Sequence, residues 1–225
     1  MRRAFALLAL CLAPAAAAAA VTVVCPIDGK EFGYEPAPAT PIRGRYLDMK
    51  PVAAYPTPWP LPQCPGNGFV VYKQGGFSAE ELARLAPFVA SDRYRAMLGT
   101  DTNYYLAATL RRKAGDPAYD VAWALAEATW QADGDPARYK RYAEEALATF
   151  NSLPEGRALP RRQNVLREMM SGELERRLGL FEAAEKRFRR VRDEAEFATS
   201  QLQQVIDLQL RLIRRRDTGS HRIPP

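Results

Sequence analysis

The chain has 225 residues, of which 32 are basic and 26 acidic, together with three cysteines, one histidine and a formal net charge of +6. A single histidine excludes a metal site built from two or three histidine ligands. The apolar share of 47% is that of a foldable globular chain and not of a disordered one. The length suits one domain with a small appendage.

Residues 1–20 have the features of a secretory signal peptide. Arg2 and Arg3 form a basic start, and residues 4–13 form an apolar run that is too short to cross a bilayer as a helix. The alanines at 15–20 then offer several Ala-x-Ala cleavage frames. We therefore expect cleavage near residue 20.

Cys11 raises lipidation as an alternative to plain cleavage, but the bulky Leu10 stands where a lipoprotein signal has a small residue. Loss of Arg2 and Arg3 with the signal peptide would lower the formal charge from +6 to +4. No later run is apolar for the length of a bilayer, so we expect no transmembrane segment. The expected location is the periplasm or the cell exterior, where disulfides persist.

The first part of the mature chain, residues 21–77, is β-prone and rich in proline. Val21–Val24 and Glu31–Tyr34 are predicted strands, and Asp28-Gly29 between them is a hairpin turn signal.

The eight prolines between residues 36 and 62 exclude a central strand or a helix interior there. Residues 69–72, Phe-Val-Val-Tyr, predict one further strand.

Residues 78–216 carry the capping residues and prolines that mark helix ends. Ser78 and Glu81 form a capping box, and Asp116-Pro117 and Asp135-Pro136 pair an N-cap with a proline at the first helical position. Short loops predict antiparallel neighbours, so the fold class is mainly α, an array of about seven helices with a small N-terminal β-knuckle. The expected helices cover 79–90, 101–114, 159–178, 181–193 and 197–216, and two more begin near 117 and 136.

One stretch follows the spacing of a tetratricopeptide repeat, in which small residues let two helices approach and aromatic residues fill the seam. The residues that carry this spacing are Gly172, Gly179, Phe181, Ala184, Phe188 and Val191. Glu168 and Ser171 occupy two positions where larger residues are expected, and an ordinary helical hairpin is the alternative. Residues 217–225, which hold the sole histidine His221, are predicted to be a disordered tail.

Cys25 and Cys64 each begin a Cys-Pro-x-x-Gly unit, the pattern of a zinc knuckle that has lost its second cysteine. Asp28 and Asn67 stand at the lost metal-ligand positions. Two such units before helical hairpins resemble the bacterial family called domain of unknown function 2225, and residues 24–32 are the most similar stretch. The resemblance implies a small ribbon followed by tetratricopeptide-like helices, and it implies no activity.

Two thiolates, a carboxylate and an amide would hold zinc poorly, so we expect no metal and no cofactor. If the two knuckles converge as the resemblance implies, Cys25 and Cys64 would meet in a disulfide. That bridge would close a loop of about 40 residues.

Two surfaces are candidates for binding. The central helices concentrate aromatic residues that predict a groove for a peptide, although core packing is the alternative. The groove candidates are Tyr104, Tyr105, Trp123, Trp130 and Tyr142, and Trp59 in its proline frame is a candidate cover.

Charge is uneven along the chain. Residues 21–156 hold 14 basic and 16 acidic residues, whereas residues 157–222 hold 16 basic and 10 acidic. Part of this excess predicts a basic face that could contact anionic lipid, cell-wall polymer or an acidic protein, and a solvated face of ion pairs is the alternative. The predicted basic face comprises Arg187, Arg189, Arg190 and Arg192.

Catalytic motifs are missing from the sequence: it holds no nucleophile elbow, phosphate loop or dinucleotide fingerprint. The acidic pairs Glu144 with Glu145 and Asp116 with Asp120 are the material for a hydrolase that acts on the cell envelope. We expect instead a non-enzymatic helical-repeat protein that binds a protein or peptide and no nucleic acid. An envelope-associated structural protein is a third possibility.

Overall fold

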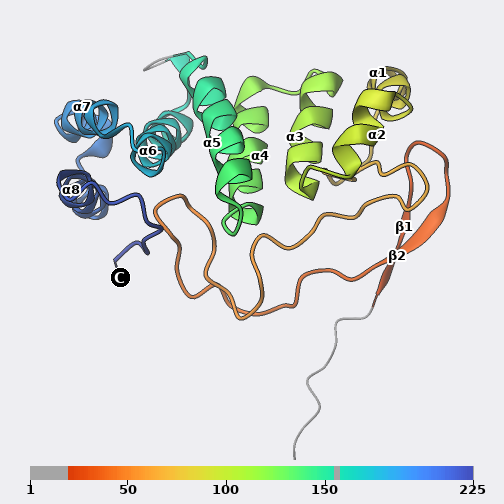
Figure 1. Cartoon of the computed structure of the whole chain (residues 1–225), viewed down its shortest axis with the longest axis horizontal. Coiled ribbons are helices and arrows are strands. Elements are labelled where there is room, and N and C mark those ends of the chain that lie inside the picture. Colours follow the sequence, from red (N-terminus) through yellow and green to blue (C-terminus); the bar gives the residue numbers. More distant parts are fainter. Residues whose placement is uncertain (1–19, 155–157, 225) are drawn as a thin grey trace, which may run out of the picture.

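The computed structural model describes residues 20–154 and 158–224, so the predicted signal peptide falls, except for Ala20, outside the described residues. The described chain is mainly α-helical with one two-stranded sheet, as the sequence predicts (Figure 1). The helices are α1 Ala79–Val89, α2 Asp92–Leu98, α3 Asn103–Ala114, α4 Ala118–Gln131, α5 Pro136–Asn151, α6 Arg161–Arg177, α7 Phe181–Arg192 and α8 Ser200–Arg214, with a 3-10 turn η2 at Ala195–Phe197.

The predicted helix starts hold at two clear caps. Ser78 and Glu81 form the capping box of α1, and Asp135 accepts the backbone N–H of Arg138 at the start of α5. The short helix α2, capped by Ser91, was not predicted. Helix α8 begins later than expected because residues 195–197 form a separate 3-10 turn.

The helices form a row in which α3 to α8 each pack against the next, while α1 packs against both α2 and α3 (Figure 1). At the α6–α7 seam, a Cβ on Gly172 would lie 2.4 Å from the ring of Phe188, so only glycine allows this approach. Gly179 takes φ +77° just after α6, a left-handed conformation that suits glycine at a helix C-terminus.

Strands β1 Val21–Val24 and β2 Glu31–Tyr34 form the predicted antiparallel hairpin. The register pairs Val21 with Tyr34 and Val24 with Glu31. The strand expected at residues 69–72 is wrong, because that segment makes only an isolated bridge between Val70 and Gln63.

The proline-rich segment, residues 35–77, is an extended strap that runs along the row of helices below them (Figure 1). Tertiary hydrogen bonds fasten it at several points. The Trp130 indole donates to the carbonyl oxygen of Asp48 at 3.2 Å, and the Asn103 side chain accepts the backbone N–H of Leu61 at 2.7 Å. Lys50 forms an ion pair with Asp133 at 2.5 Å.

The C-terminal segment, residues 217–224, is docked and not disordered as predicted. The backbone N–H of Leu47 donates to the carbonyl oxygen of His221, and that of Ile223 donates to the carbonyl oxygen of Arg45, each at 2.8 Å. The segment therefore lies antiparallel to the strap, through a bridge between Tyr46 and Arg222.

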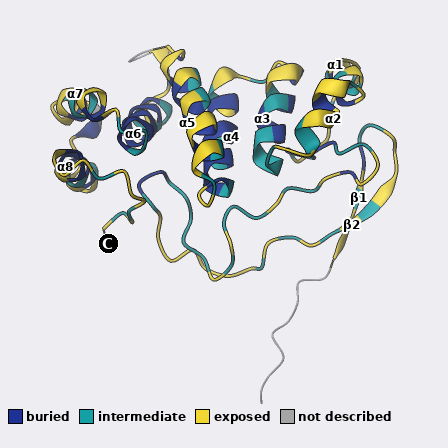
Figure 2. Ribbon diagram, in the orientation of Figure 1, coloured by how far each residue is buried: buried dark blue, intermediate teal, exposed yellow. Residues whose placement is uncertain are grey.

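The core falls into three clusters along the row, one around the knuckles and α1–α3, one between α3 and α6, and one between α6 and α8. Buried residues line the inner sides of the helices, whereas much of the strap is exposed or half-buried (Figure 2). Among residues 20–154 and 158–224, no helix combines the length and apolar composition needed to cross a bilayer.

Candidate functional site

The two Cys-Pro-x-x-Gly units fold as two copies of the same turn. In each, the cysteine N–H bonds the carbonyl oxygen five residues later at 2.8 Å, and the cysteine carbonyl oxygen accepts from the glycine four residues later at 2.9 Å. Those glycines, Gly29 and Gly68, have φ of +71° and +73°. Cys25 and Cys64 are 1% exposed and form the expected disulfide, with their Cα atoms 5.6 Å apart.

Asp28 and Asn67 close these turns. The Asp28 carboxylate accepts the backbone N–H of Lys30 at 3.2 Å, and the Asn67 carbonyl oxygen accepts that of Phe69 at 2.9 Å. The Asn67 amide also donates to the sulfur of Cys25 at 3.5 Å. In the part of the chain that the structure describes, no group of three or more cysteine, histidine or acidic residues could hold a metal ion.

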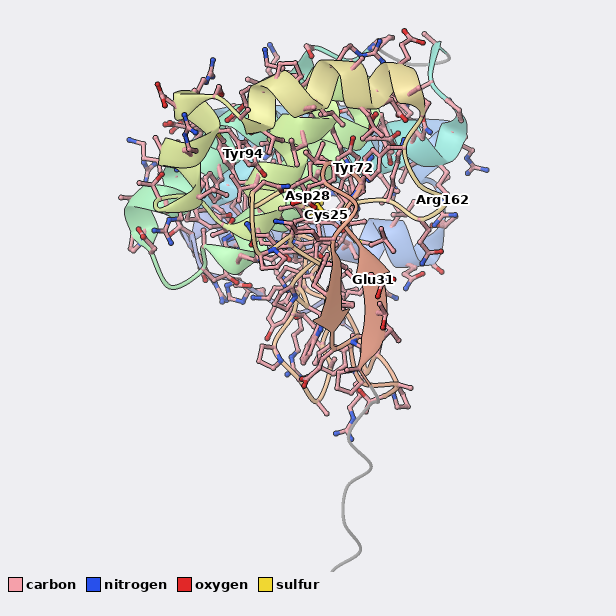
Figure 3. The ribbon with its side chains drawn as sticks, turned by 90° about the vertical axis from the view of Figure 1, so that its right-hand side faces the viewer. Cys25, Asp28, Glu31, Tyr72, Tyr94 and Arg162 are labelled. Carbon is pink, nitrogen blue, oxygen red and sulfur yellow. A yellow bond between two sulfur atoms is a disulfide. The ribbon has the colours of Figure 1, made fainter. Side chains whose placement is uncertain are left out.

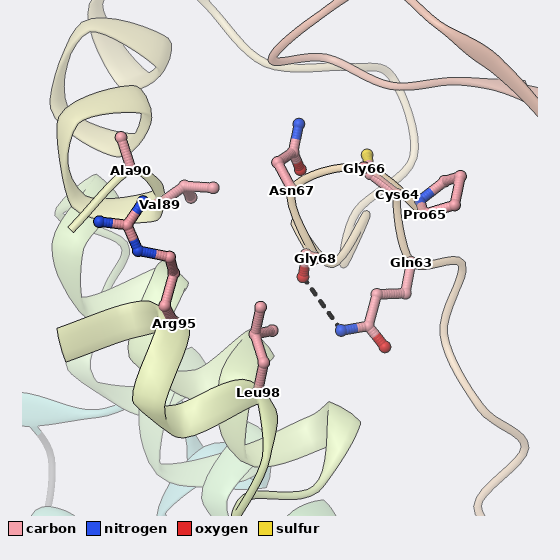
Figure 4. Close-up of a pocket in the computed structure, with 10 residues that line it drawn as sticks. All are labelled: Gln63, Cys64, Pro65, Gly66, Asn67, Gly68, Val89, Ala90, Arg95 and Leu98. Atoms are coloured by element: carbon pink, nitrogen blue, oxygen red, sulfur yellow. Dashed lines mark hydrogen bonds between the residues drawn. The ribbon is translucent and has the colours of Figure 1, made fainter. Parts of the chain in front are cut away.

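The knuckles lie between the hairpin and the helices, as Cys25 and Asp28 show in Figure 3. A hollow of about 480 Å³ separates the second knuckle from α1 and α2 (Figure 4). Gln63 donates to the carbonyl oxygen of Gly68 at 3.1 Å on its wall. Because a Cβ on Gly68 would meet Leu98 at 2.5 Å, this hollow borders a packing seam between the strap and α2.

The prediction of an aromatic groove on the central helices is wrong, because its residues do not form one surface. Tyr142 is fully buried and Trp130 is 5% exposed, and both belong to the core. Tyr105 stacks on Tyr142 with ring centroids 4.2 Å apart, and its hydroxyl donates to Glu145 at 2.6 Å. Tyr104 is covered by the strap, because its hydroxyl donates to the carbonyl oxygen of Trp59 at 3.1 Å.

Trp123 is the exception among the predicted groove residues. It is half-buried on α4, and it lines two hollows next to α6. Its indole meets that of Trp130 edge to face, with centroids 6.2 Å apart, so its orientation is held from the core side.

The basic face predicted on α7 is also wrong, because carboxylates neutralise it. Arg187 is largely buried and forms ion pairs with Glu168 and Glu175, each at 2.7 Å. Arg190 also binds Glu168 at 2.7 Å. The other two members pair one for one, Arg189 with Glu185 and Arg192 with Asp207.

A different surface emerges where the strap, the helices and the C-terminal segment meet. Three hollows of about 660, 560 and 380 Å³ follow one another there. The first two share Arg45 and Met49, and the last two share Trp123, Arg162 and Leu166. Shared walls make them one continuous surface, which we name the arginine groove.

Apolar side chains from five separate segments form the floor of the arginine groove. They are Met49 of the strap, Trp123 of α4, Val165 and Leu166 of α6, Leu202 of α8 and Ile223 of the C-terminal segment. Each is half-buried, so part of each side chain remains available to a ligand. Met49 takes φ +68°, an uncommon conformation for a residue other than glycine, and such strain concentrates at binding sites.

Arginines form the rim of the groove. They are Arg43 and Arg45 of the strap, Arg161 and Arg162 of α6 and Arg222 near the C-terminus, against the single carboxylate of Asp120. Arg45 donates to the backbone carbonyl oxygen of Met49 at 2.9 Å, which leaves its charge uncompensated. Arg161 and Arg162 occupy the first turn of α6, where the helix dipole disfavours cations and which contains no acidic residue of its own.

Glu127 lies one helical turn after Trp123 on α4 and is half-buried. Burial raises the pKa of its carboxyl from 4.5 to about 7, although Arg111 and a hydrogen bond to Trp123 act in the opposite direction. The carboxyl therefore titrates near neutrality. The sequence carries no signal for this group, because its burial arises only when the chain folds.

The carboxylates proposed for hydrolysis do not gather at one place. Asp116 pairs with Arg111 at 2.8 Å, and Glu145 pairs with Arg112 at 2.6 Å. Glu144 lies 3.8 Å from Lys140, and Asp120 alone lines the arginine groove. The hydrolase interpretation therefore stays a hypothesis without a paired-acid site among the described residues.

No protein-family model, no curated protein and no solved structure matches the chain. The resemblance to domain of unknown function 2225, and with it the tetratricopeptide likeness of α6 and α7, remains a prediction from the residues quoted above.

Proposed function

We propose that the chain is a non-enzymatic binding module that holds a protein segment or peptide in the arginine groove. The observation that supports the proposal is the continuity of three hollows over a half-buried apolar floor. Helical arrays with such concave apolar surfaces commonly bind peptides. The module would work in the periplasm or outside the cell, where a buried Cys25–Cys64 disulfide is stable.

The groove is built from segments that the fold holds rigidly. The floor residues of α4, α6 and α8 lie on packed helices, and the strap is fastened at Lys50 and Asp48 next to Met49. A preformed site loses little conformational entropy when it binds. We therefore expect binding without large rearrangement of the helices.

Selection of short random peptides on the immobilised protein tests this function. Binding peptides should be enriched by the wild-type chain and lost with Leu202→Asp, which places a charge on the floor. Gln204→Asp is the matched control, since Gln204 is exposed on the same helix and lies outside the three hollows. Enrichment that survives Leu202→Asp, or no enrichment by the wild-type chain, would contradict the proposal.

A further inference from the structure

The net charge of the arginine groove defines the chemistry of its occupant. Five arginines surround it and one carboxylate, Asp120, faces them. In the described chain, Arg43, Arg45, Arg162 and Arg222 form no ion pair with a carboxylate. An uncompensated cationic rim attracts an anionic partner and accelerates its association.

Arg187 and Arg190 of α7 show how arginines that stabilise the fold are paired in this chain. The single carboxylate of Glu168 accepts hydrogen bonds from both Arg187 and Arg190, each at 2.7 Å. These two partners hold the pKa of the Glu168 carboxyl below its ordinary value. Among the described residues, no such acid pairs with Arg43, Arg45, Arg162 or Arg222 of the groove. The contrast separates a structural set of arginines from a set whose charge is left for a ligand.

The floor requires that the occupant also carry apolar groups. Trp123, Leu166 and Leu202 are half-buried beneath the arginines, so a purely ionic ligand would leave them in water. Charged groups at the rim and apolar groups on the floor match a chain whose side chains alternate in character. An extended peptide provides this alternation, because successive side chains point to opposite faces.

The shape favours a peptide over a membrane surface. The hollows are concave and follow one another from the strap and the C-terminal segment to α4 and α6, and a flat bilayer cannot follow such a recess. The strap segment around Arg45 already accepts an extended partner, since residues 221–223 of the same chain pair with it in antiparallel fashion.

We propose that the arginine groove binds an extended acidic peptide, with its carboxylates on Arg45 and Arg162 and its apolar side chains on Trp123 and Leu202. This inference rests on the proposed function and adds the charge and conformation of the ligand. The groove would then select partners by alternating acidic and apolar residues.

The test uses three fluorescein-labelled peptides of one length, alternating Leu with Glu, Gln or Lys, and fluorescence anisotropy with the whole chain. The Glu peptide should bind, with affinity falling as sodium chloride rises from about 50 mM to about 500 mM. The Gln peptide should bind about tenfold or more weakly, and the Lys peptide weaker still.

Two charge reversals locate the binding. Arg162→Glu should weaken the Glu peptide by about tenfold or more, while Arg189→Glu, on the neutralised α7 block, should change it by less than about twofold. Because an acid in the first turn of α6 favours the helix dipole, Arg162→Glu should keep its thermal midpoint, so its loss of binding cannot be attributed to misfolding.

Other outcomes would overturn one or both proposals. Equal binding of the Glu and Gln peptides that is lost with Leu202→Asp would overturn the acidic preference and leave the proposed function standing. Equal loss from both charge reversals would assign the effect to net charge and overturn the site. Binding of phosphatidylglycerol vesicles with no peptide binding would favour a membrane surface and overturn the peptide, and no binding of any probe would overturn both proposals.

Discussion

Arg176 of α6 donates hydrogen bonds to the backbone carbonyl oxygens of Asp217 and Gly219, the latter at 2.9 Å. This guanidinium is fully buried, and it also binds the Glu173 carboxylate at 2.7 Å and the Gln209 side chain at 3.0 Å. A buried cation of this kind is stable only with all its partners in place. Through it, the third core cluster holds the C-terminal segment that forms one wall of the arginine groove.

Replacement of Arg176 by Met should therefore destabilise the fold by about 3–5 kcal/mol, because Glu173 would be left as an unpaired buried charge. Urea unfolding measures the change. The control is Arg189→Met, which removes an exposed pair with Glu185 and should cost less than about 1 kcal/mol. Similar losses in the two variants would contradict the structural role of Arg176.

Gly172→Ala should destabilise the chain by about 1–3 kcal/mol, since the new methyl group would overlap the buried ring of Phe188. Gly134→Ala is the matched control, because no heavy atom lies within 4 Å of a Cβ there. In the double variant Gly172→Ala with Phe188→Leu, the smaller side chain at position 188 should recover part of the lost stability. A Gly172→Ala chain as stable as the wild type would contradict the close approach of α6 and α7.

The Cys25–Cys64 disulfide should stabilise the chain by about 4 kcal/mol, since it closes a loop with a sequence separation of 39 residues. The double variant Cys25→Ala and Cys64→Ala should lose this amount in urea unfolding, and a reductant should destabilise the wild type but not the variant. Mass spectrometry of the non-reduced protein checks the bond directly. Two free thiols at these positions would contradict it.

The raised pKa of Glu127 predicts a pH dependence of stability. The unfolded chain ionises this carboxyl near pH 4.5 and the folded chain near pH 7, so rising pH favours the unfolded state across that interval. The free energy of unfolding of the wild type should fall relative to Glu127→Gln between these values and then run parallel. A constant difference between the two proteins from pH 4 to pH 8 would contradict the buried carboxyl.

Local sequence signals predict the helices and strands well, but they do not predict the tertiary contacts of the side chains. The Ser78 capping box and Asp135 before Pro136 defined helix starts from a few neighbouring residues. The sequence predicts a basic face from the arginines of α7. Their partners Glu168 and Glu175 lie on the preceding helix, so the ion pairs become apparent only when α6 and α7 pack together.

The same limit applies to the site. Of the predicted aromatic groove, Trp123 lines the arginine groove, and its neighbours there come from the strap, α6 and α8. The strap follows no periodic pattern; contacts such as Trp130 with Asp48, 82 residues apart, determine its path. The C-terminal segment has the composition of a tail, yet Arg176 orders it from within the core.

The most direct measurement of the central claim is the map of contacts made by a bound acidic peptide. A Leu-Glu peptide that carries a photoactivatable diazirine in place of one Leu is irradiated with the intact chain, and the modified residues are identified by mass spectrometry. The adducts should fall on Met49, Trp123, Leu166 and Leu202, the floor of the arginine groove. Adducts concentrated on α7 around Arg189, or spread evenly over the exposed surface, would contradict the account.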